Sequence, residues 1–480
     1  MGSLKKEMVS GVAWLTISKY SALIVQFVVT IIISRILSPE DYGIIGFLYV
    51  FLAIGSILLD SGFGQALIQK GKEVKNIDYC SVFYVNVFIG FLLYLVLYFS
   101  APFIAGFYEL PEIVTLGRLI FLIIPVTSFG VIHNTMLTKE LKFKDISVIG
   151  LISGLVSGVL GVFLAYNGYG IYSLVLQVLS LNIIRTLLLI FINKWLPSLE
   201  FSKNSIRALL PLSISLLGEG SLIVVFNNIY IIIIGKFYNI IDVGYYNQAK
   251  RFAELSSTSL TGVIFSVSFP ALVKIKHDLN GLKDAYTRII TMTVFILVPV
   301  MLLLIVIGDD LFGILLTDKW LPAVPYFRLL CLYGITFPLH QINTNIFKVL
   351  GKGKKILLIE IIRRVLLVVS IICSINLSIS YLLIGQIIAM LVIVVVNMCF
   401  SGKEINYPIF HQFKDVLPYY LIGLLTSIFV YYVPFPNGHV IFKLLISGFL
   451  FGVLYLFLNR VFKTSAYSEF TGIIKLKFVN

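Results

Sequence analysis

Charged residues are scarce in this sequence. Asp, Glu, Lys and Arg together make up 12% of its 480 residues, whereas soluble domains carry about 25% of such residues. Hydrophobic residues supply 59% of the chain, and the mean hydropathy is +1.00. A chain of this composition has too little polar surface to enclose a core in water. Soluble classes of protein are therefore excluded, and a polytopic membrane protein is predicted.

Motifs for nucleotide, metal and sugar-bond chemistry are also missing. The chain has no GxxxxGK[ST] loop for ATP phosphates, no HExxH or CxxC motif for a metal, and no cluster of carboxylates in a loop. Its four cysteines, Cys80, Cys331, Cys373 and Cys399, lie far apart inside apolar runs, so no disulfide framework is indicated. We expect no cofactor and no enzyme activity. The energy source is then a gradient, of H⁺ or Na⁺, or the substrate itself.

Long apolar runs are what the sequence does have. With about 20 residues needed to cross a bilayer as a helix, fourteen runs qualify. Unbroken apolarity with scattered glycines is typical of helices, because strands of a membrane barrel are short and alternate. The predicted fold is all-α, with about fourteen transmembrane helices. Their approximate bounds are 10–33, 43–68, 79–104, 114–138, 146–166, 170–193, 208–234, 244–270, 287–308, 323–347, 356–376, 380–400, 416–433 and 440–459.

The net charge of +14 gathers on one side of these runs. Between alternate runs, 25 Lys and Arg residues fall on one side and four on the other. The positive-inside rule places the basic side and both termini in the cytoplasm. The basic character therefore reports orientation, and no nucleic-acid partner is expected.

A short motif occurs twice. SRILSPEDYG at 34–43 aligns without gaps on GKFYNIIDVG at 235–244, an offset of 201, and Gly43 falls on Gly244. A second match, at an offset of 210, pairs Arg118 with Arg328 and His133 with Asn343. Internal symmetry of this kind is common in secondary transporters, whose binding sites lie between the repeats. We predict domains at 1–200, 201–402 and 403–480, the last holding two extra spans and a cytoplasmic tail.

Charges inside the spans are the first candidates for function, because each costs at least about 2.5 kcal/mol at the centre of a membrane. Lys19 lies deep in the first span with Gln26 on the same face, and Glu219 lies beside the corresponding place in the seventh. Lys19 and Glu219 indicate either midplane chemistry or a structural ion pair between the halves. The ionisable residues of the spans are Lys19, Arg118, Arg185, Lys250, Arg251, Arg328, Arg363, Arg364, Asp60, Glu219, Glu254 and Glu360.

Several of these positions have two interpretations. Glu254 is spaced for a salt bridge with Lys250 on one helix. The positive charge of Arg251 is then not neutralised by Glu254 and could bind an anionic substrate. Arg118 and Arg328 suit either anchoring at the interface or lining a cavity. Asp60 suits either a proton or cation site or a helix cap among small residues.

Polar residues form a further group in the tenth span. His340, Asn343, Thr344 and Phe347 share a helix face beneath Pro338. His133 and Asn134 lie in the fourth span. Amides beside aromatic rings suit sugar hydroxyls and arginines suit phosphate, although a buried His is more often simply hydrogen-bonded. The predicted substrate-binding residues are Lys19, Gln26, Arg118, His133, Asn134, Arg185, Lys250, Arg251, Arg328, His340, Asn343 and Arg363, and the ion-coupling candidates are Asp60, Glu219, Glu254 and Glu360.

The first two spans carry a resemblance. SRILSPEDYG followed by LLDSGFGQALIQ resembles the Wzx-type polysaccharide flippases, relatives of the MATE multidrug extruders in the MOP superfamily, and most of all the branch for capsule, colanic-acid and teichuronic-acid export. This resemblance implies two six-helix lobes forming a V around a cationic cavity. It also implies a substrate, an undecaprenyl-diphosphate-linked oligosaccharide, moved from the cytoplasmic to the periplasmic leaflet of a bacterial inner membrane by alternating access. The expected partners are this substrate, membrane lipids and polysaccharide polymerase machinery.

Other functions remain open on the sequence. A MATE-like drug or cation antiporter would favour buried carboxylates, yet the spans hold eight cations and four acids. A membrane polymerase or glycosyltransferase needs catalytic groups in a sizeable loop, and the predicted outer loops are short. A protein that only binds partners would not need so many costly charges.

Overall fold

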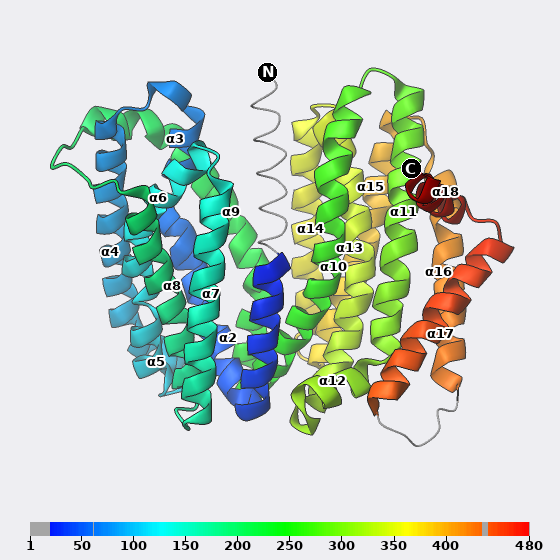
Figure 1. Ribbon diagram of the computed structural model, residues 1–480, viewed down its shortest axis with the longest axis horizontal. Helices are drawn as coiled ribbons and strands as arrows, with labels where there is room; N and C mark the ends of the chain where they lie inside the picture. The colour runs from blue at the N-terminus through cyan, green and yellow to red at the C-terminus, as the bar shows by residue number, and fades with distance from the viewer. Residues whose placement is uncertain (1–19, 61, 434–439, 480) are drawn as a thin grey trace. The chain divides into compact units, whose positions relative to one another are not determined.

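The computed structural model describes residues 20–60, 62–433 and 440–479, and within these ranges all regular elements are helical (Figure 1). This confirms the predicted all-α class. A helix Tyr20–Ile36 comes first. It is followed by α2 (Pro39–Asp60), α3 (Phe63–Gln69), η1 (Gly71–Glu73), α4 (Asn76–Tyr108), α5 (Ile113–Ile120), α6 (Ile123–Lys139), α7 (Phe143–Tyr166), α8 (Tyr172–Asn193), α9 (Lys203–Phe237), α10 (Ile240–Lys274), α11 (Leu279–Val306), α12 (Gly308–Leu316), η2 (Asp318–Ala323), α13 (Val324–Val349), α14 (Gly353–Ser374), α15 (Ile379–Glu404), α16 (Ile409–Tyr432), α17 (Val440–Val461) and α18 (Ser465–Val479).

Helices overlap all fourteen predicted ranges, but the number of spans differs. Ten helices of the described chain are long and apolar enough to cross a membrane, so the predicted count of fourteen is not confirmed. Among the helices at predicted spans, Tyr20–Ile36 is too short within the described residues, and α10, α13 and α14 also fail the test. Polar and charged residues lower the hydropathy of α10 and α13, whereas the apolar α14 carries Glu360, Arg363 and Arg364 close together.

Two compact units make up the chain, Met1–Gly244 and Tyr245–Asn480. The division comes later than the repeat boundary at 200, because α9 packs on α2, α3 and α4 within the first unit. In that unit α6 lies between α4 and α8, and α7 packs along α8 (Figure 1). In the second unit α13 packs on α11, α14 and α15, while α16 packs on α11 and α17. The final helix, α18, lies across one end of α11 (Figure 1).

Breaks interrupt two of the predicted spans. The second span divides into α2 and α3, and Gly62 at the break has a φ of 69°, a backbone conformation that glycine adopts without strain. A Cβ on Gly62 would lie 2.9 Å from the backbone oxygen of Ser213 on α9. The fourth span divides into α5 and α6 at Phe121 and Leu122. Each broken segment, Pro39–Gln69 and Ile113–Lys139, still counts as one helix long and apolar enough to cross a membrane.

Candidate functional site

Three side chains of the second unit meet between α13, α14 and α15. Nε2 of His340 on α13 lies 3.4 Å from Oε1 of Glu360 on α14. The other ring nitrogen, Nδ1, lies 2.5 Å from Nδ2 of Asn397 on α15. Arg363 donates two hydrogen bonds, at 2.7 and 3.1 Å, to the Glu360 carboxylate. The structure therefore joins in one network His340 and Arg363, predicted to bind substrate, and Glu360, predicted to couple an ion.

The sequence of α14 explains the pair that Glu360 and Arg363 form in this network. Glu360 and Arg363 are three residues apart and share a helix face, with the acid toward the N-terminus, which is the favourable order for such a pair. The remainder of the helix is largely apolar, so each charge needs a partner. The side chains of Glu360 and Arg363 are 27% and 22% exposed, whereas that of His340 is 5% exposed. The carboxylate is thus the part of the network that reaches the surface of the unit.

A second network lies beside the first and is fully buried. Oδ1 of Asn343 accepts hydrogen bonds from the hydroxyls of Tyr286, at 2.8 Å, and Ser401, at 2.5 Å. Its Nδ2 donates to the backbone oxygen of Leu339 at 2.8 Å. Asn343 has no exposed surface. Its amide is therefore occupied by protein partners from α11, α13 and α15, and its predicted role in binding substrate stays a prediction.

The first unit holds a counterpart of the histidine site. Nδ1 of His133 on α6 lies 3.4 Å from Nδ2 of Asn193 on α8. The edge of the same imidazole packs against Trp195, with ring centroids 5.4 Å apart. No carboxylate of the described residues forms an ion pair with His133. The two units thus share a His–Asn pair, and the second adds Glu360 and Arg363.

The two histidines do not lie at equivalent positions of the repeat. Helices α6 and α13 end at Lys139 and Val349, and α7 and α14 begin at Phe143 and Gly353, so both boundaries keep the offset of 210. At that offset His133 falls on Asn343, and His340 lies three residues earlier in α13. The two His–Asn pairs are therefore similar in composition but are not related by the repeat.

The two arginines of the repeat have the same backbone contact. Nε of Arg118 donates to the backbone oxygen of Tyr98 at 3.4 Å, and Nε of Arg328 donates to that of Ile305 at 3.1 Å. Arg118 also lies 4.2 Å over the ring of Tyr98, and Arg328 pairs with Asp309 at 2.5 Å. The Tyr98 carbonyl lacks a partner within α4 because Pro102 follows four residues later, and the Ile305 carbonyl lies at the end of α11. Both arginines therefore bond to carbonyl groups that the helices leave unpaired, and both of their interpretations stay predictions.

The repeated elbow motifs contact each other within the first unit. A Cβ added to Gly43 would lie 2.0 Å from the backbone oxygen of Ile240, and one added to Gly244 would lie 1.9 Å from that of Pro39. Pro39 and Ile240 are themselves related by the offset of 201. The contact is therefore reciprocal, and each glycine permits a backbone approach that no side chain would allow.

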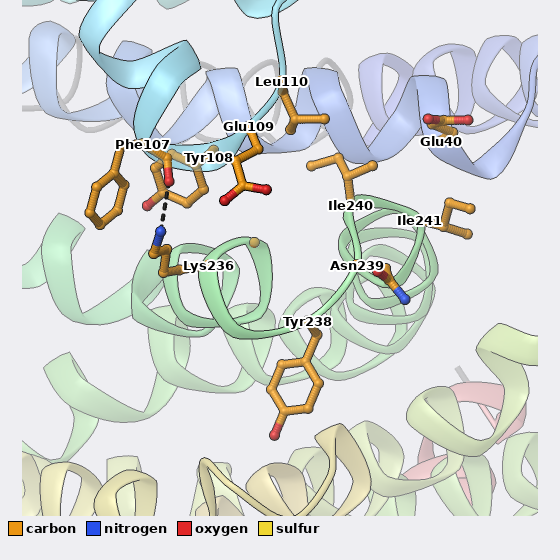
Figure 2. Close-up of a pocket in the computed structure, with 11 residues that line it drawn as sticks. Glu40, Phe107, Tyr108, Glu109, Leu110, Lys236, Tyr238, Asn239, Ile240 and Ile241 are labelled. Atoms are coloured by element: carbon orange, nitrogen blue, oxygen red, sulfur yellow. Dashed lines mark hydrogen bonds between the residues drawn. The ribbon is translucent and has the colours of Figure 1, made fainter.

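A pocket of about 360 Å³ lies beside this contact (Figure 2). Lys236 donates a hydrogen bond of 2.7 Å to the backbone oxygen of Phe107 and lies 3.9 Å from the centre of its ring, which joins the ends of α9 and α4. Glu109, at a φ of 60°, points into the space beside Lys236 (Figure 2). Burial, and then the charge of Asp242, raise the pKa of Tyr238 in the pocket wall. The phenol is therefore neutral and able to donate a hydrogen bond.

The remaining predicted residues are dispersed. Glu254 pairs with Lys250 at 3.9 Å, as their spacing indicates. Asp60 ends α2 directly before the break, but α3 has Gly62 as its N-cap and no side-chain cap hydrogen bond, so both interpretations of Asp60 stay predictions. Lys19 lies outside the described residues, so its relation to Glu219 is not described. Gln26, Arg185 and Glu219 are exposed on their helices, Arg251 is half-buried, and Asn134 is half-buried with an Oδ1 that has no hydrogen-bond partner.

Sequence reasoning missed several members of the two networks. Asn397 is one of two amide side chains in the apolar run 380–400, with Gln386, and the cost of burying an amide in a membrane could have marked it. Tyr286, Ser401 and Gln412 lie just outside the predicted runs, where polar residues are ordinary. No signal in the sequence singled them out.

Comparison with known proteins decides the family. The model of a family described as polysaccharide biosynthesis protein matches residues 32–325, more than half of the chain. The chain belongs to this polysaccharide biosynthesis protein family. The match includes both elbow motifs and the break between α5 and α6. It agrees with the resemblance of the first two spans to polysaccharide flippases.

Three proteins with similar sequences are named for the biosynthesis or transport of surface polysaccharides. It is 25% identical over 356 residues to the teichuronic acid biosynthesis protein TuaB of Bacillus subtilis, covering 74% of this chain and 73% of TuaB. It is 27% identical to the succinoglycan biosynthesis transport protein ExoT of Rhizobium meliloti, covering 69% and 67% of the two chains. It is 23% identical to the lipopolysaccharide biosynthesis protein WzxC of Escherichia coli, covering 69% and 68%.

Solved structures establish the fold. The lipid II flippase MurJ, in an inward closed conformation, matches with a TM-score of 0.75 at 19% identity over 93% of this chain and 98% of MurJ. An inward-facing MATE transporter of the MOP superfamily matches with a TM-score of 0.58 at 17% identity over 82% and 98%. The family member is therefore a multi-pass membrane protein with a MOP-superfamily fold.

Proposed function

We propose that this polysaccharide biosynthesis protein family member is a flippase for lipid-linked oligosaccharides. It moves undecaprenyl-diphosphate-linked repeat units from the cytoplasmic to the periplasmic leaflet of a bacterial inner membrane by alternating access, for surface polysaccharide biosynthesis. Both termini face the cytoplasm, as the distribution of basic residues indicates. A gradient of H⁺ or Na⁺ supplies the energy, and polysaccharide polymerase machinery receives the product.

The proposal rests on the combination of the family match with the fold. The family match over residues 32–325 and the MurJ-like fold over 93% of the chain apply to the same molecule. Relatives of that family are named for teichuronic acid biosynthesis, succinoglycan transport and lipopolysaccharide biosynthesis. A protein of polysaccharide biosynthesis that has the fold of a lipid-linked sugar flippase is best explained as a flippase itself.

The charges of the helices support an anionic substrate. Arg185, on a helix long and apolar enough to span a membrane, is exposed on the surface of its unit. Guanidinium groups bind phosphate oxygens in a two-pronged arrangement, as a diphosphate-linked lipid requires. A transporter that expels cationic drugs would gain nothing from such a group. The MATE-like antiporter is therefore the second candidate, favoured by the shared fold alone.

Reconstitution tests the proposal. Purified protein is placed in liposomes that contain an undecaprenyl-diphosphate oligosaccharide with a fluorescent label, and a quencher that cannot cross the membrane is added outside. We expect the fraction of label that is quenched to rise with time above that in protein-free vesicles. An unchanged fraction would refute flipping. Transport of ethidium in the same vesicles would support the antiporter instead, and formation of a glycosidic bond would support a polymerase or glycosyltransferase.

A further inference from the structure

We infer that His340, Glu360 and Asn397 form a proton-binding site inside the second unit, and that a pH gradient drives flipping through it. The inference rests on the proposed flippase function, because it names the ion that powers it. The site lies between α13, α14 and α15, and its central group is the imidazole of His340. Histidine is the side chain whose charge ordinarily changes between about pH 5 and 8.

The two ring nitrogens of His340 face different kinds of partner. Nε2 lies 3.4 Å from a carboxylate oxygen of Glu360, and Nδ1 lies 2.5 Å from Nδ2 of Asn397. A neutral ring fits this arrangement when Nε2–H donates to the carboxylate and Nδ1 accepts from the amide. The proton on Nε2 is therefore held between α13 and α14 in either charge state of the ring.

Asn397 can supply the hydrogen-bond acceptor that the protonated ring of His340 needs. Its Oδ1 is buried and has no hydrogen-bond partner. A half-turn of the amide would exchange Oδ1 with Nδ2 and present an acceptor to Nδ1, and a protonated ring donates from both nitrogens. The amide can thus satisfy His340 with or without the additional proton. A site built for one protonation state would not leave a buried acceptor unused beside the ring.

The charges around the His340 ring determine how proton binding changes the contact between α13 and α14. Glu360 and Arg363 already form a neutral pair, so a proton on His340 adds one positive charge to the network. Tyr333 on α13 lies within the fields of Arg363, Glu360 and Glu254, the last contributed by α10. Glu254 pairs with Lys250 on its own helix. Proton binding therefore turns the contact between His340 and Glu360 into an ion pair across α13 and α14, and proton loss weakens the link between these helices.

The network reaches the surface of the unit at Glu360 and Arg363. Their side chains are 27% and 22% exposed, whereas the His340 side chain is 5% exposed. The additional proton belongs on Nδ1, beside Asn397, because Nε2 already donates to the carboxylate.

The first unit provides a natural control. His133 has the same amide partner, Asn193, but a Trp195 ring edge takes the place of the acid. The same substitution can therefore be made at His133 and at His340, and only His340 has a carboxylate as a partner. We expect only the His340 site to respond to changes at Glu360.

The first test measures proton binding without any substrate. The full-length protein in nanodiscs carries ¹⁵N-labelled histidine, and the ring signals of His340 are assigned by their loss in His340→Gln. We expect the pH dependence of these signals to be displaced in Glu360→Gln and unchanged in His133→Gln. Asn397→Leu keeps every charge and should displace the curve as well, which preserves the test if Glu360→Gln fails to fold. A ring that does not titrate, or a curve that these variants leave unchanged, overturns the site.

The second test measures coupling. Coupling to one proton predicts that a gradient of one pH unit shifts the steady-state distribution of labelled lipid between leaflets about tenfold. This shift should vanish in Glu360→Gln and His340→Gln and persist in His277→Gln, which changes an exposed histidine outside the predicted binding residues. An equal shift in all four proteins, or none in the wild type that still flips, overturns the inference. Absence of flipping in the wild type would refute the proposed function, whereas the titration would still decide the proton site.

Discussion

Buried amides of the second unit bond across helices. Asn343 joins α13 to Tyr286 of α11 and Ser401 of α15, and Tyr286 also donates to Gln412 of α16 at 3.3 Å. Within a bilayer these groups have no water to replace a lost partner, so each is expected to matter more than its position in an apolar run suggests. Asn182 offers a contrast, because its amide donates only to the backbone oxygen of Val178 in its own helix, at 2.8 Å.

Asn343→Leu should destabilise the protein. The substitution removes the acceptor that the buried hydroxyls of Tyr286 and Ser401 share, and leaves them only longer bonds to Gln412 and to the backbone oxygen of Met398, at 3.3 and 3.4 Å. Each lost hydrogen bond costs about 0.5–1.5 kcal/mol. The midpoint of thermal unfolding in detergent measures the effect. Asn182→Leu is the matched control and should change stability by less than about 0.5 kcal/mol. Equal midpoints for the two variants would contradict the cross-helix role of Asn343.

At the scale of elements, helices contact through a few backbone positions. The N-terminal turns of α2 and α10 meet at Gly43 and Gly244. The start of α18 is held by Tyr419 of α16, whose hydroxyl accepts from the backbone N–H of Ala466 at 3.0 Å and lies 3.2 Å from Oγ of Ser465. These contacts, rather than whole helix faces, set where the elements join.

Gly43→Ala and Gly244→Ala should each separate the N-terminal turns of α2 and α10. The added methyl group would meet a backbone oxygen at 2.0 or 1.9 Å, and backbone cannot yield as a side chain does. Overpacking of this kind costs about 1–3 kcal/mol, so the unfolding midpoint should fall. Gly154→Ala, where nothing lies within 4 Å, is the control and should leave stability unchanged or slightly raised. A fall in the control of the same size would refute the explanation.

Tyr419→Phe should release the first turn of α18. The variant removes the acceptor of the Ala466 N–H, and hydrogen–deuterium exchange of that turn should become faster. Arg288→Gln breaks an ion pair with Glu469, but the Arg288 side chain is 72% exposed, and exposed pairs contribute about 0–1 kcal/mol. Exchange in Arg288→Gln should therefore stay close to wild type. Slow exchange in Tyr419→Phe would show that the hydroxyl does not hold the helix.

At the scale of the whole molecule, the distribution of basic residues predicts orientation. Segments rich in Lys and Arg belong to the cytoplasm, and Glu112 and Lys319 belong to outer connections. The two units have related helices, but their His–Asn pairs differ in the acid that only the second unit supplies. The two units are therefore related in fold but unequal in the partners of these histidines.

Cysteine labelling tests the orientation. In a variant lacking the four native cysteines, Glu112→Cys and Lys319→Cys should react in intact cells with a maleimide that cannot cross membranes. Lys142→Cys and Lys354→Cys should react only after the cells are opened. The reverse pattern would invert the assigned topology and with it the direction of flipping.

The sequence by itself determined where helices form and that Gly43 and Gly244 are equivalent, while the side of the membrane that the basic residues mark stays a prediction. These properties follow from hydropathy, charge and spacing along one stretch of chain, which need no partner to be specified. Tertiary structure alone decided that the two glycines contact each other's helices, and that Glu360 and Asn397 face the imidazole of His340. Such pairings depend on the register between packed helices, which the pattern along one helix does not specify.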